Sequence, residues 1–126
     1  MNNNELVTAS SMTDLEFINA VAFDNQGLVP VIAQDASSGE VLMLAWMNRQ
    51  ALELTLESKR GTYFSRSRSR IWVKGEESGN IQQVVSMSLD CDGDALVMQV
   101  HQHGPACHTG SRTCFSRLRE LEIDSA

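Results

Sequence analysis

The sequence predicts an α+β fold, a largely antiparallel sheet with a few short helices. Segments of β-type composition outnumber helical ones, and strands do not alternate with helices as they would in βαβ units. No repeat, linker or low-complexity stretch divides the 126 residues. We therefore expect a flexible polar tail over residues 1–12 and a single domain over residues 13–126.

The first half of the chain opens with a helix signal and a hairpin signal. Thr13 and Glu16 have the spacing of a capping box ahead of apolar residues, which predicts a short N-terminal helix. Apolar runs at residues 28–33 and 41–47 flank a polar, glycine-containing segment. Such a pattern is typical of two strands joined by a turn.

A second helix is expected between this hairpin and the remaining strands. Asn48 can cap a helix over residues 49–59, which has leucines at helical spacing and should stop near Gly61. After it, β-type composition recurs between glycines. The further strands are predicted at residues 62–67, 71–74, 82–89 and 95–102.

Three aspartates and all three cysteines lie within 25 residues, a density that indicates metal binding. In an extended strand Asp90, Asp92 and Asp94 would share one side, with Cys91 on the other. The Asp-Gly pair at 92–93 is equally a hairpin signal, and a turn would also bring the carboxylates together. Carboxylates suit Mg²⁺ and thiolates suit Zn²⁺, so two adjacent metal sites are expected.

The cysteine spacing constrains the zinc site. Cys107 and Cys114 are seven residues apart, which on a straight helix is about 10 Å of rise. Thiolates that share a zinc at about 2.3 Å have sulfurs roughly 3.8 Å apart, so the chain between them must fold back. With Cys91 they make three ligands, which leaves one tetrahedral position open, as in catalytic sites.

Three histidines near the cysteines leave the nature of this site open. If one of them supplied a fourth ligand, the zinc would be structural rather than catalytic. His108 directly follows a presumed ligand and is the candidate for proton transfer. His101 and His103 are better explained as residues of a strand face.

A basic cluster in this acidic chain indicates an anionic ligand. Six of the ten basic residues fall within sixteen positions: Lys59, Arg60, Arg66, Arg68, Arg70 and Lys74. Serine and arginine alternate over residues 65–70, so a strand would present its arginines on one face for forked contacts with phosphate. Tyr63 and Trp72 could stack on a ring nearby. The alternative is a solvated strand face, or an edge that blocks sheet aggregation.

Charge and composition narrow the partners to small molecules. A net charge of −6 argues against binding to nucleic acid or to an anionic membrane. The N-terminus lacks the basic and apolar regions of a signal peptide, and no apolar run approaches membrane-spanning length. We therefore expect a cytoplasmic location, where the thiols stay reduced.

Taken together, these segments resemble the phosphoribosyl-AMP cyclohydrolase family. The resemblance covers most of residues 29–115 in the family's order. Its motifs are VPVIAQD at 29–35, LMLAWMN at 42–48, YFSRSR at 63–68, WVKGE at 72–76, SG at 78–79, DCDGD at 90–94, ACHTG at 106–110 and CF at 114–115.

The resemblance implies a function and two metal cofactors. The reaction would be hydrolytic opening of the N1–C6 bond of the adenine ring in 1-(5-phosphoribosyl)-AMP by a zinc-activated water, a step of histidine biosynthesis. One Zn²⁺ per subunit would be held by the three cysteines and one Mg²⁺ by the three aspartates. The family also implies an intertwined homodimer, in which we expect Cys91 to face Cys107 and Cys114 of the other chain.

Other side chains then take roles around this chemistry. His108 is the expected catalytic base, and the expected substrate-binding residues are Arg66, Arg68, Trp72 and Lys74. Two competing interpretations remain at this point: a non-catalytic domain stapled by zinc that binds a nucleotide or a partner protein, and a nucleotide-binding regulator without turnover. Neither accounts for the cysteines, aspartates and arginines together.

Overall fold

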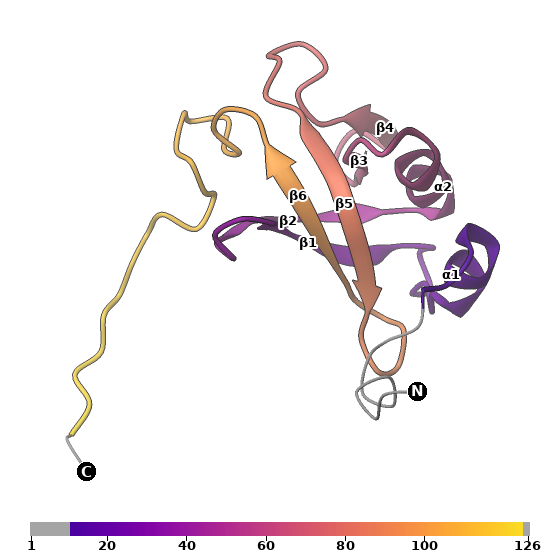
Figure 1. Cartoon of the computed structure of the whole chain (residues 1–126), viewed down its shortest axis with the longest axis horizontal. Helices are drawn as coiled ribbons and strands as arrows, with labels where there is room; N and C mark the ends of the chain where they lie inside the picture. Colours follow the sequence, from indigo (N-terminus) through magenta and orange to yellow (C-terminus); the bar gives the residue numbers. More distant parts are fainter. Residues whose placement is uncertain (1–10, 125–126) are drawn as a thin grey trace, which may run out of the picture.

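A four-stranded sheet carries the fold, which the computed structural model describes over residues 11–124 (Figure 1). In spatial order its strands are β2 (Val41–Met47), β1 (Val29–Asp35), β6 (Leu96–Gln102) and β5 (Gln82–Leu89). A separate hairpin consists of β3 (Thr62–Ser65) and β4 (Arg70–Val73), and the helices are α1 (Asp14–Ala20) and α2 (Arg49–Ser58). Most of the predicted tail at residues 1–12 lies outside the described residues.

The prediction of an α+β fold with a mostly antiparallel sheet is confirmed. β1 pairs with β2, β3 with β4, and β5 with β6 in antiparallel ladders. The parallel ladder joins β1 to β6, with Val31 beside Leu96 and Asp35 beside Val100. This ladder makes β1 and β6 the central strands, and one face of each supplies fully buried side chains to the core.

Both helices begin as their sequences predict. The Thr13 hydroxyl accepts a 3.1 Å hydrogen bond from the Glu16 N–H, and the Glu16 carboxylate accepts a 2.9 Å bond from the Thr13 N–H. The Asn48 side chain accepts from the Ala51 N–H at 2.8 Å. α2 ends at a left-handed Lys59 (φ 60°), two residues ahead of the expected glycine.

Gly61 has a different reason to be glycine. A Cβ at this position would lie 2.5 Å from the side-chain oxygen of Gln82 on β5. Its N–H donates a 3.0 Å hydrogen bond to the Gln82 carbonyl. Gly61 therefore permits the close approach of the segment before β3 to the edge of β5.

The arginine-rich segment forms a turn, so the prediction of a strand with its arginines on one face was wrong. β3 ends at Ser65, residues 66–69 make the turn, and β4 begins at Arg70. Apolar cross-strand pairs such as Tyr63 with Trp72 stabilise this ladder, which ends at the polar pair of Ser65 with Arg70. The serine and arginine alternation adds no apolar pair beyond it, and Arg66 and Arg68 lie in the turn.

The helices and the β3–β4 hairpin cover one side of the sheet (Figure 1). α1 buries Phe17 and Ile18, and α2 buries Ala51 and Leu52. Tyr63 of β3 is fully buried in the same core. At about 1.5–3 kcal/mol for each large apolar side chain, this burial fixes the hairpin that carries the arginines.

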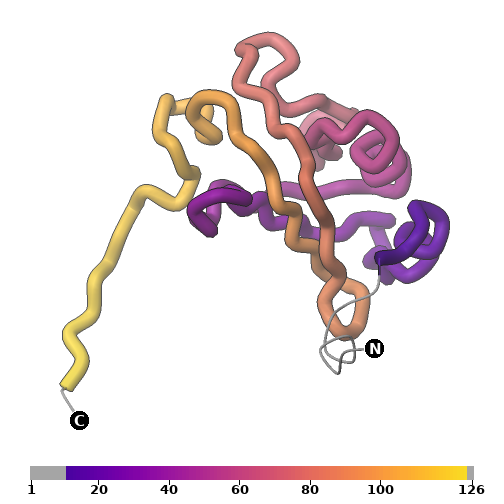
Figure 2. Tube along the Cα trace, in the orientation of Figure 1, coloured from indigo at the N-terminus to yellow at the C-terminus, as the bar shows by residue number. Residues whose placement is uncertain are grey.

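After β6 the chain leaves the sheet. Beyond Cys114 it runs away from the other elements, which Figure 2 shows as the yellow end of the trace. We call residues 115–124 the C-terminal arm; its apolar side chains are exposed, among them Leu118 at 79% and Ile123 at 88%. Within residues 11–124, neither helix has the length and apolar character to cross a membrane.

Candidate metal and nucleotide site

The three aspartates lie on the turn that joins β5 to β6. The Asp94 N–H donates a 3.0 Å hydrogen bond to a carboxylate oxygen of Asp90, and the Asp90 N–H donates to the Ala95 carbonyl at 3.0 Å. One oxygen from each of Asp90, Asp92 and Asp94 lies within 4.8 Å of the others. Of the two geometries open to the sequence, the chain adopts the turn, and the carboxylates converge as both geometries predicted.

This turn is anchored to the end of α1. The Ala22 N–H donates to the Gly93 carbonyl at 2.8 Å. Gly93 has φ 76°, and a Cβ on it would lie 2.5 Å from the Ala20 carbonyl oxygen. Glycine is required here by both the backbone angle and the contact, so the turn has a fixed position before any ion binds.

The carboxylates of the turn repel one another. A hydrogen bond shared with Asp90 raises the pKa of Asp94, and the negative charges of Asp90 and Asp92 raise it further. Three exposed carboxylates gathered on one turn are a suitable oxygen ligand set for a hard divalent cation, which would offset this repulsion.

Cys107 and Cys114 lie together in the loop after β6. The loop folds back as the spacing predicted, because the Cys107 N–H donates to the Ser111 carbonyl at 3.1 Å and the Cys114 N–H donates to the Leu42 carbonyl of β2 at 2.7 Å. The Thr109 hydroxyl lies 3.1 Å from the Cys107 sulfur. Hydrogen bonds from Thr109 lower the pKa of Cys107, whereas desolvation and the neighbouring Cys107 raise the pKa of Cys114.

Cys91 lies apart from this pair. Its sulfur is 3.4 Å from an Asp92 oxygen on the β5–β6 turn. That turn precedes β6 and the loop with Cys107 and Cys114 follows it, so they lie at opposite ends of the strand, as Figure 1 shows. Seven residues of strand span roughly 20 Å. Among the described residues the aspartates are the one group of three metal-binding side chains that meet within a single chain.

The predicted substrate-binding residues divide into two neighbourhoods. Lys74, directly after β4, is close enough to the thiols of Cys107 and Cys114 to lower the pKa of the first. The Arg66 guanidinium carbon lies 4.6 Å from the ring centre of Trp46. Trp72 lines two cavities, one together with Arg68 and the other together with Arg66.

The predicted base and the other histidines are solvent-facing. His108 is exposed on the loop beside Cys107. His101 is an exposed residue of β6, in agreement with its interpretation as a strand-face residue, whereas His103 is exposed just beyond the strand, so that interpretation was wrong for His103.

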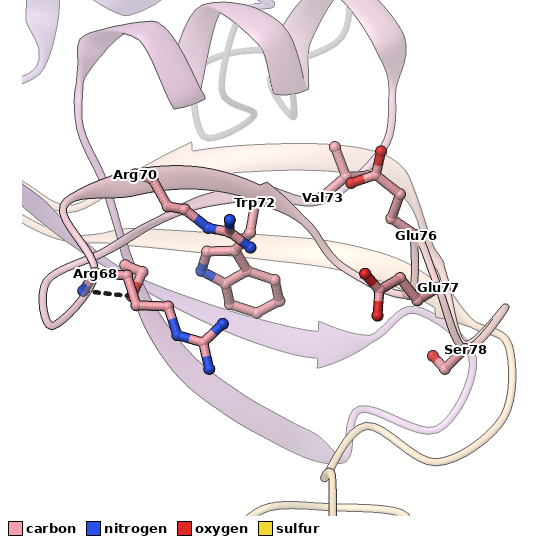
Figure 3. Close-up of a pocket in the computed structure, with 9 residues that line it drawn as sticks. Arg68, Arg70, Trp72, Val73, Glu76, Glu77 and Ser78 are labelled. Atoms are coloured by element: carbon pink, nitrogen blue, oxygen red, sulfur yellow. Dashed lines mark hydrogen bonds between the residues drawn. The ribbon is translucent and has the colours of Figure 1, made fainter.

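Two further residues at this site were not among the four expected substrate-binding residues. Arg70 and Glu77 line a cavity with Trp72 (Figure 3). Arg70 belonged to the basic cluster, but the expected strand gave no reason to separate it from Arg66. Nothing in the sequence places Glu77 opposite the arginines, because this depends on how the loop after β4 folds back.

Comparison with known proteins identifies a family for this site. A family model described as phosphoribosyl-AMP cyclohydrolase matches residues 43–116. A phosphoribosyl-AMP cyclohydrolase of Chlorobium phaeovibrioides is 54% identical over 104 residues, 82% of this chain and 76% of that protein. One from Dinoroseobacter shibae is 60% identical over 96 residues, 76% of this chain and 81% of the other.

A longer relative contains a similar segment. A histidine biosynthesis bifunctional protein of Thermus thermophilus is 62% identical over 108 residues, which are 85% of this chain. The chain spans half the length of that relative.

Proposed function

This chain belongs to the phosphoribosyl-AMP cyclohydrolase family, and we propose that it hydrolyses the adenine ring of phosphoribosyl-AMP at a metal site shared between two copies of the chain. In this reaction a water oxygen bonds to C6, the C6–N1 bond breaks, and N1 takes up a proton. The product is an imidazole carboxamide ribotide. The ribosyl group on N1 makes the ring electron-poor and therefore open to attack.

The observation that carries the proposal is the pairing of Cys107 with Cys114 on a loop that faces Lys74. Two thiols side by side, one with a lowered pKa, are suited to bind a soft cation such as zinc. Zinc in a site of three thiolates activates water as a nucleophile near neutral pH. The third thiol is Cys91.

The position of Cys91 is the reason for proposing two copies. Cys91 precedes β6 and the other two thiols follow it, so a single chain does not complete the ligand set. In a two-fold dimer each Cys91 can meet the thiol pair of the other copy, which gives two equivalent sites. The exposed apolar side chains of the C-terminal arm provide surface that such a partner could bury.

The neighbouring side chains would serve this site in different ways. Asp90, Asp92 and Asp94 would hold Mg²⁺, one per subunit. His108, exposed next to Cys107, would move a proton at the reacting centre. The cationic side chains would bind the phosphates, with Trp72 beside them: Arg66, Arg68 and Lys74.

Turnover tests the proposal directly. The purified chain with zinc and Mg²⁺ should change the ultraviolet spectrum of phosphoribosyl-AMP as the ring opens. Ser at Cys91, Cys107 or Cys114 should each abolish the change and lower bound zinc below one ion per chain, because an alcohol remains protonated and ligates poorly. Tight binding of the nucleotide by the zinc-loaded chain without ring opening would favour a regulator, and full activity without zinc would contradict the proposed metal chemistry.

A mixing experiment tests the shared site. Cys91→Ser and Cys107→Ser proteins should each be inactive, whereas unfolding and refolding them together should restore activity. Each mixed dimer has one intact site and one doubly damaged site, and random pairing makes half the dimers mixed, so about a quarter of wild-type activity should return. A folded mixture without recovery would place all three thiols of each site in one chain.

A further inference from the structure

A cavity of about 470 Å³ lies against Trp72, between the β3–β4 turn and the loop after β4 (Figure 3). Its volume falls within the range of small-molecule sites, roughly 300–1,000 Å³. The polar side chains that line it come from both segments: Ser65, Arg68, Arg70, Glu76, Glu77 and Ser78.

The two sides of this cavity carry opposite charge. In Figure 3 the guanidinium groups of Arg70 and Arg68 lie above and below the Trp72 ring, and the Glu77 carboxylate is directed toward the ring from the loop after β4. Among residues 11–124, none of the ion pairs involves these arginines or Glu77. The charges face the same space without neutralising each other, so a ligand with an anionic end and hydroxyl groups can satisfy both.

Both loops that bear these groups are held by backbone contacts. The Arg68 N–H donates a 3.2 Å hydrogen bond to the Ser65 hydroxyl within the β3–β4 turn. In the other loop the Gly79 N–H donates to the Gly75 carbonyl at 2.8 Å. A Cβ on Gly75, which has φ 78°, would lie 2.3 Å from the Asn80 backbone. The cavity is therefore preorganised, which lowers the entropic cost of binding.

The cavity adjoins the thiol pair along one strand face. Side chains two residues apart on a strand point the same way, so Arg70 and Trp72 share a face that continues toward Lys74. Lys74 in turn lies near Cys107 and Cys114. A ligand anchored at Arg70 and lying across Trp72 thus extends toward the proposed reaction centre.

Arg66 belongs to a different neighbourhood. Its guanidinium stacks 4.6 Å from the ring centre of Trp46 and lines a second, more open cavity with Phe64. Trp72 and Ser65 line both cavities. Two arginine-bearing cavities that share a wall match a ligand that has two phosphates.

We propose that the Arg68–Arg70 cavity binds one phosphoribosyl arm of the substrate, with the phosphate on the two guanidinium groups and the ribose hydroxyls on Glu77, while Arg66 meets the phosphate of the other arm. This assignment rests on the proposed function for the identity of the substrate. Paired guanidinium groups suit phosphate, and carboxylates bind ribose diols in nucleotide sites.

Ribose 5-phosphate is a probe for this cavity that requires no turnover. NMR titration of the full chain in phosphate-free buffer measures the affinity. The affinity for ribose 5-phosphate should fall about tenfold or more in Arg68→Ala and in Glu77→Gln. At the residues that line the Arg68–Arg70 cavity, the shifts caused by ribose 5-phosphate should be the same in Arg66→Ala as in the wild type, and the same in Glu57→Gln, an exposed control on α2. The wild type should prefer ribose 5-phosphate over 2-deoxyribose 5-phosphate, and Glu77→Gln should lose that preference.

Kinetics with phosphoribosyl-AMP should test both cavities at once, because this substrate has two phosphates. Both Arg66→Ala and Arg68→Ala should raise its KM about tenfold or more. Arg68→Lys keeps the charge and should recover part of the affinity, which separates binding from folding. Equal binding of ribose 5-phosphate by all variants of an active enzyme would overturn the cavity assignment. Selective loss in Arg68→Ala and Glu77→Gln, in a chain that never opens the ring, would support the cavity and reject the proposed reaction.

Discussion

The side chain of Arg112 lies 2.6 Å from the carboxylate of Glu40, and this ion pair connects the loop of the thiol pair to the β1–β2 hairpin. Arg112 sits between Cys107 and Cys114 in sequence and also reaches Asp35 at 3.5 Å. Its carbonyl accepts a hydrogen bond from the Ala106 N–H at 3.0 Å. The distance between the two thiols is thus supported from outside the loop.

Removal of this support should weaken the proposed zinc site. Arg112→Ala should lower zinc affinity up to about fivefold, since exposed ion pairs of this kind contribute roughly 0.2–1 kcal/mol. Competition with a chromogenic chelator measures the change. Arg49→Ala, which removes an exposed ion pair with Glu53 on α2, is the matched control, and equal affinity in both variants would show that the loop holds its shape without Arg112.

The aspartate turn should bind its ion independently of the thiols. Asp92→Asn removes one carboxylate charge and should weaken Mg²⁺ binding while zinc content stays near that of the wild type. Calorimetric titration with Mg²⁺ and metal analysis of the same sample give both quantities. Loss of both metals in step would instead indicate one shared cluster or a locally unfolded turn.

A buried polar network should stabilise the hairpin that carries the arginines. The Tyr63 hydroxyl donates to the Gln82 side-chain oxygen at 2.5 Å, and the Gln82 amide donates to the Gln102 oxygen at 2.9 Å. Tyr63 and Gln82 are fully buried, and burial raises the pKa of Tyr63. Gln82→Leu should therefore destabilise the fold by about 1–3 kcal/mol, measured by urea denaturation, because the phenol loses its partner.

Tyr63→Phe provides the control for this network. In the Gln82→Leu background it should cost less than it does alone, because the phenol there has no partner to lose. Strictly additive changes in the free energy of unfolding would show that the two side chains act separately.

Asp35 should make the free energy of unfolding depend on pH in the acidic range. Hydrogen bonds from Ser38, chiefly its backbone N–H and then its hydroxyl, lower the pKa of Asp35, and Arg112 acts in the same direction. A carboxyl whose pKa is lower in the folded state stabilises the fold above its unfolded value of about 3.8. That contribution disappears as the pH falls below this value.

The wild type should consequently melt at a higher temperature than Asp35→Asn. This difference should be largest at pH 6–7 and should shrink as the pH falls below about 4. Glu57→Gln, which changes an exposed carboxylate on α2, serves as the control. A difference that stays constant down to pH 3 would mean that hydrogen-bond geometry, not charge, explains the effect of the substitution.

Local signals in the sequence predicted the local structure. The Thr13 and Asn48 caps, the hairpin at residues 28–47 and the bounds of β5 follow from patterns a few residues long. The convergence of the aspartates was predictable because both geometries allowed by the Asp-Gly pair produce it.

Long-range relationships were not predictable in the same way. The parallel pairing of β1 with β6 joins Val31 to Leu96 across 65 positions, and no local pattern encodes it. The strand predicted at residues 62–67 ends at Ser65, because the chain reverses over residues 66–69 to pair Ser65 with Arg70, and alternation alone does not reveal where a strand reverses. The opposition of Glu77 to Arg68 depends on the folding of two separate loops.

The separation of the thiols along β6 has a consequence for how the protein would load its metal. If each ion needs a thiol pair from one chain and Cys91 from another, zinc affinity becomes a function of protein concentration, and dilution should release zinc even when free zinc is held constant. By mass action, zinc would in turn tighten subunit association, and a chelator would loosen it. The amount of chain made by a cell would then set not only the number of catalytic sites but also the fraction of them that are complete.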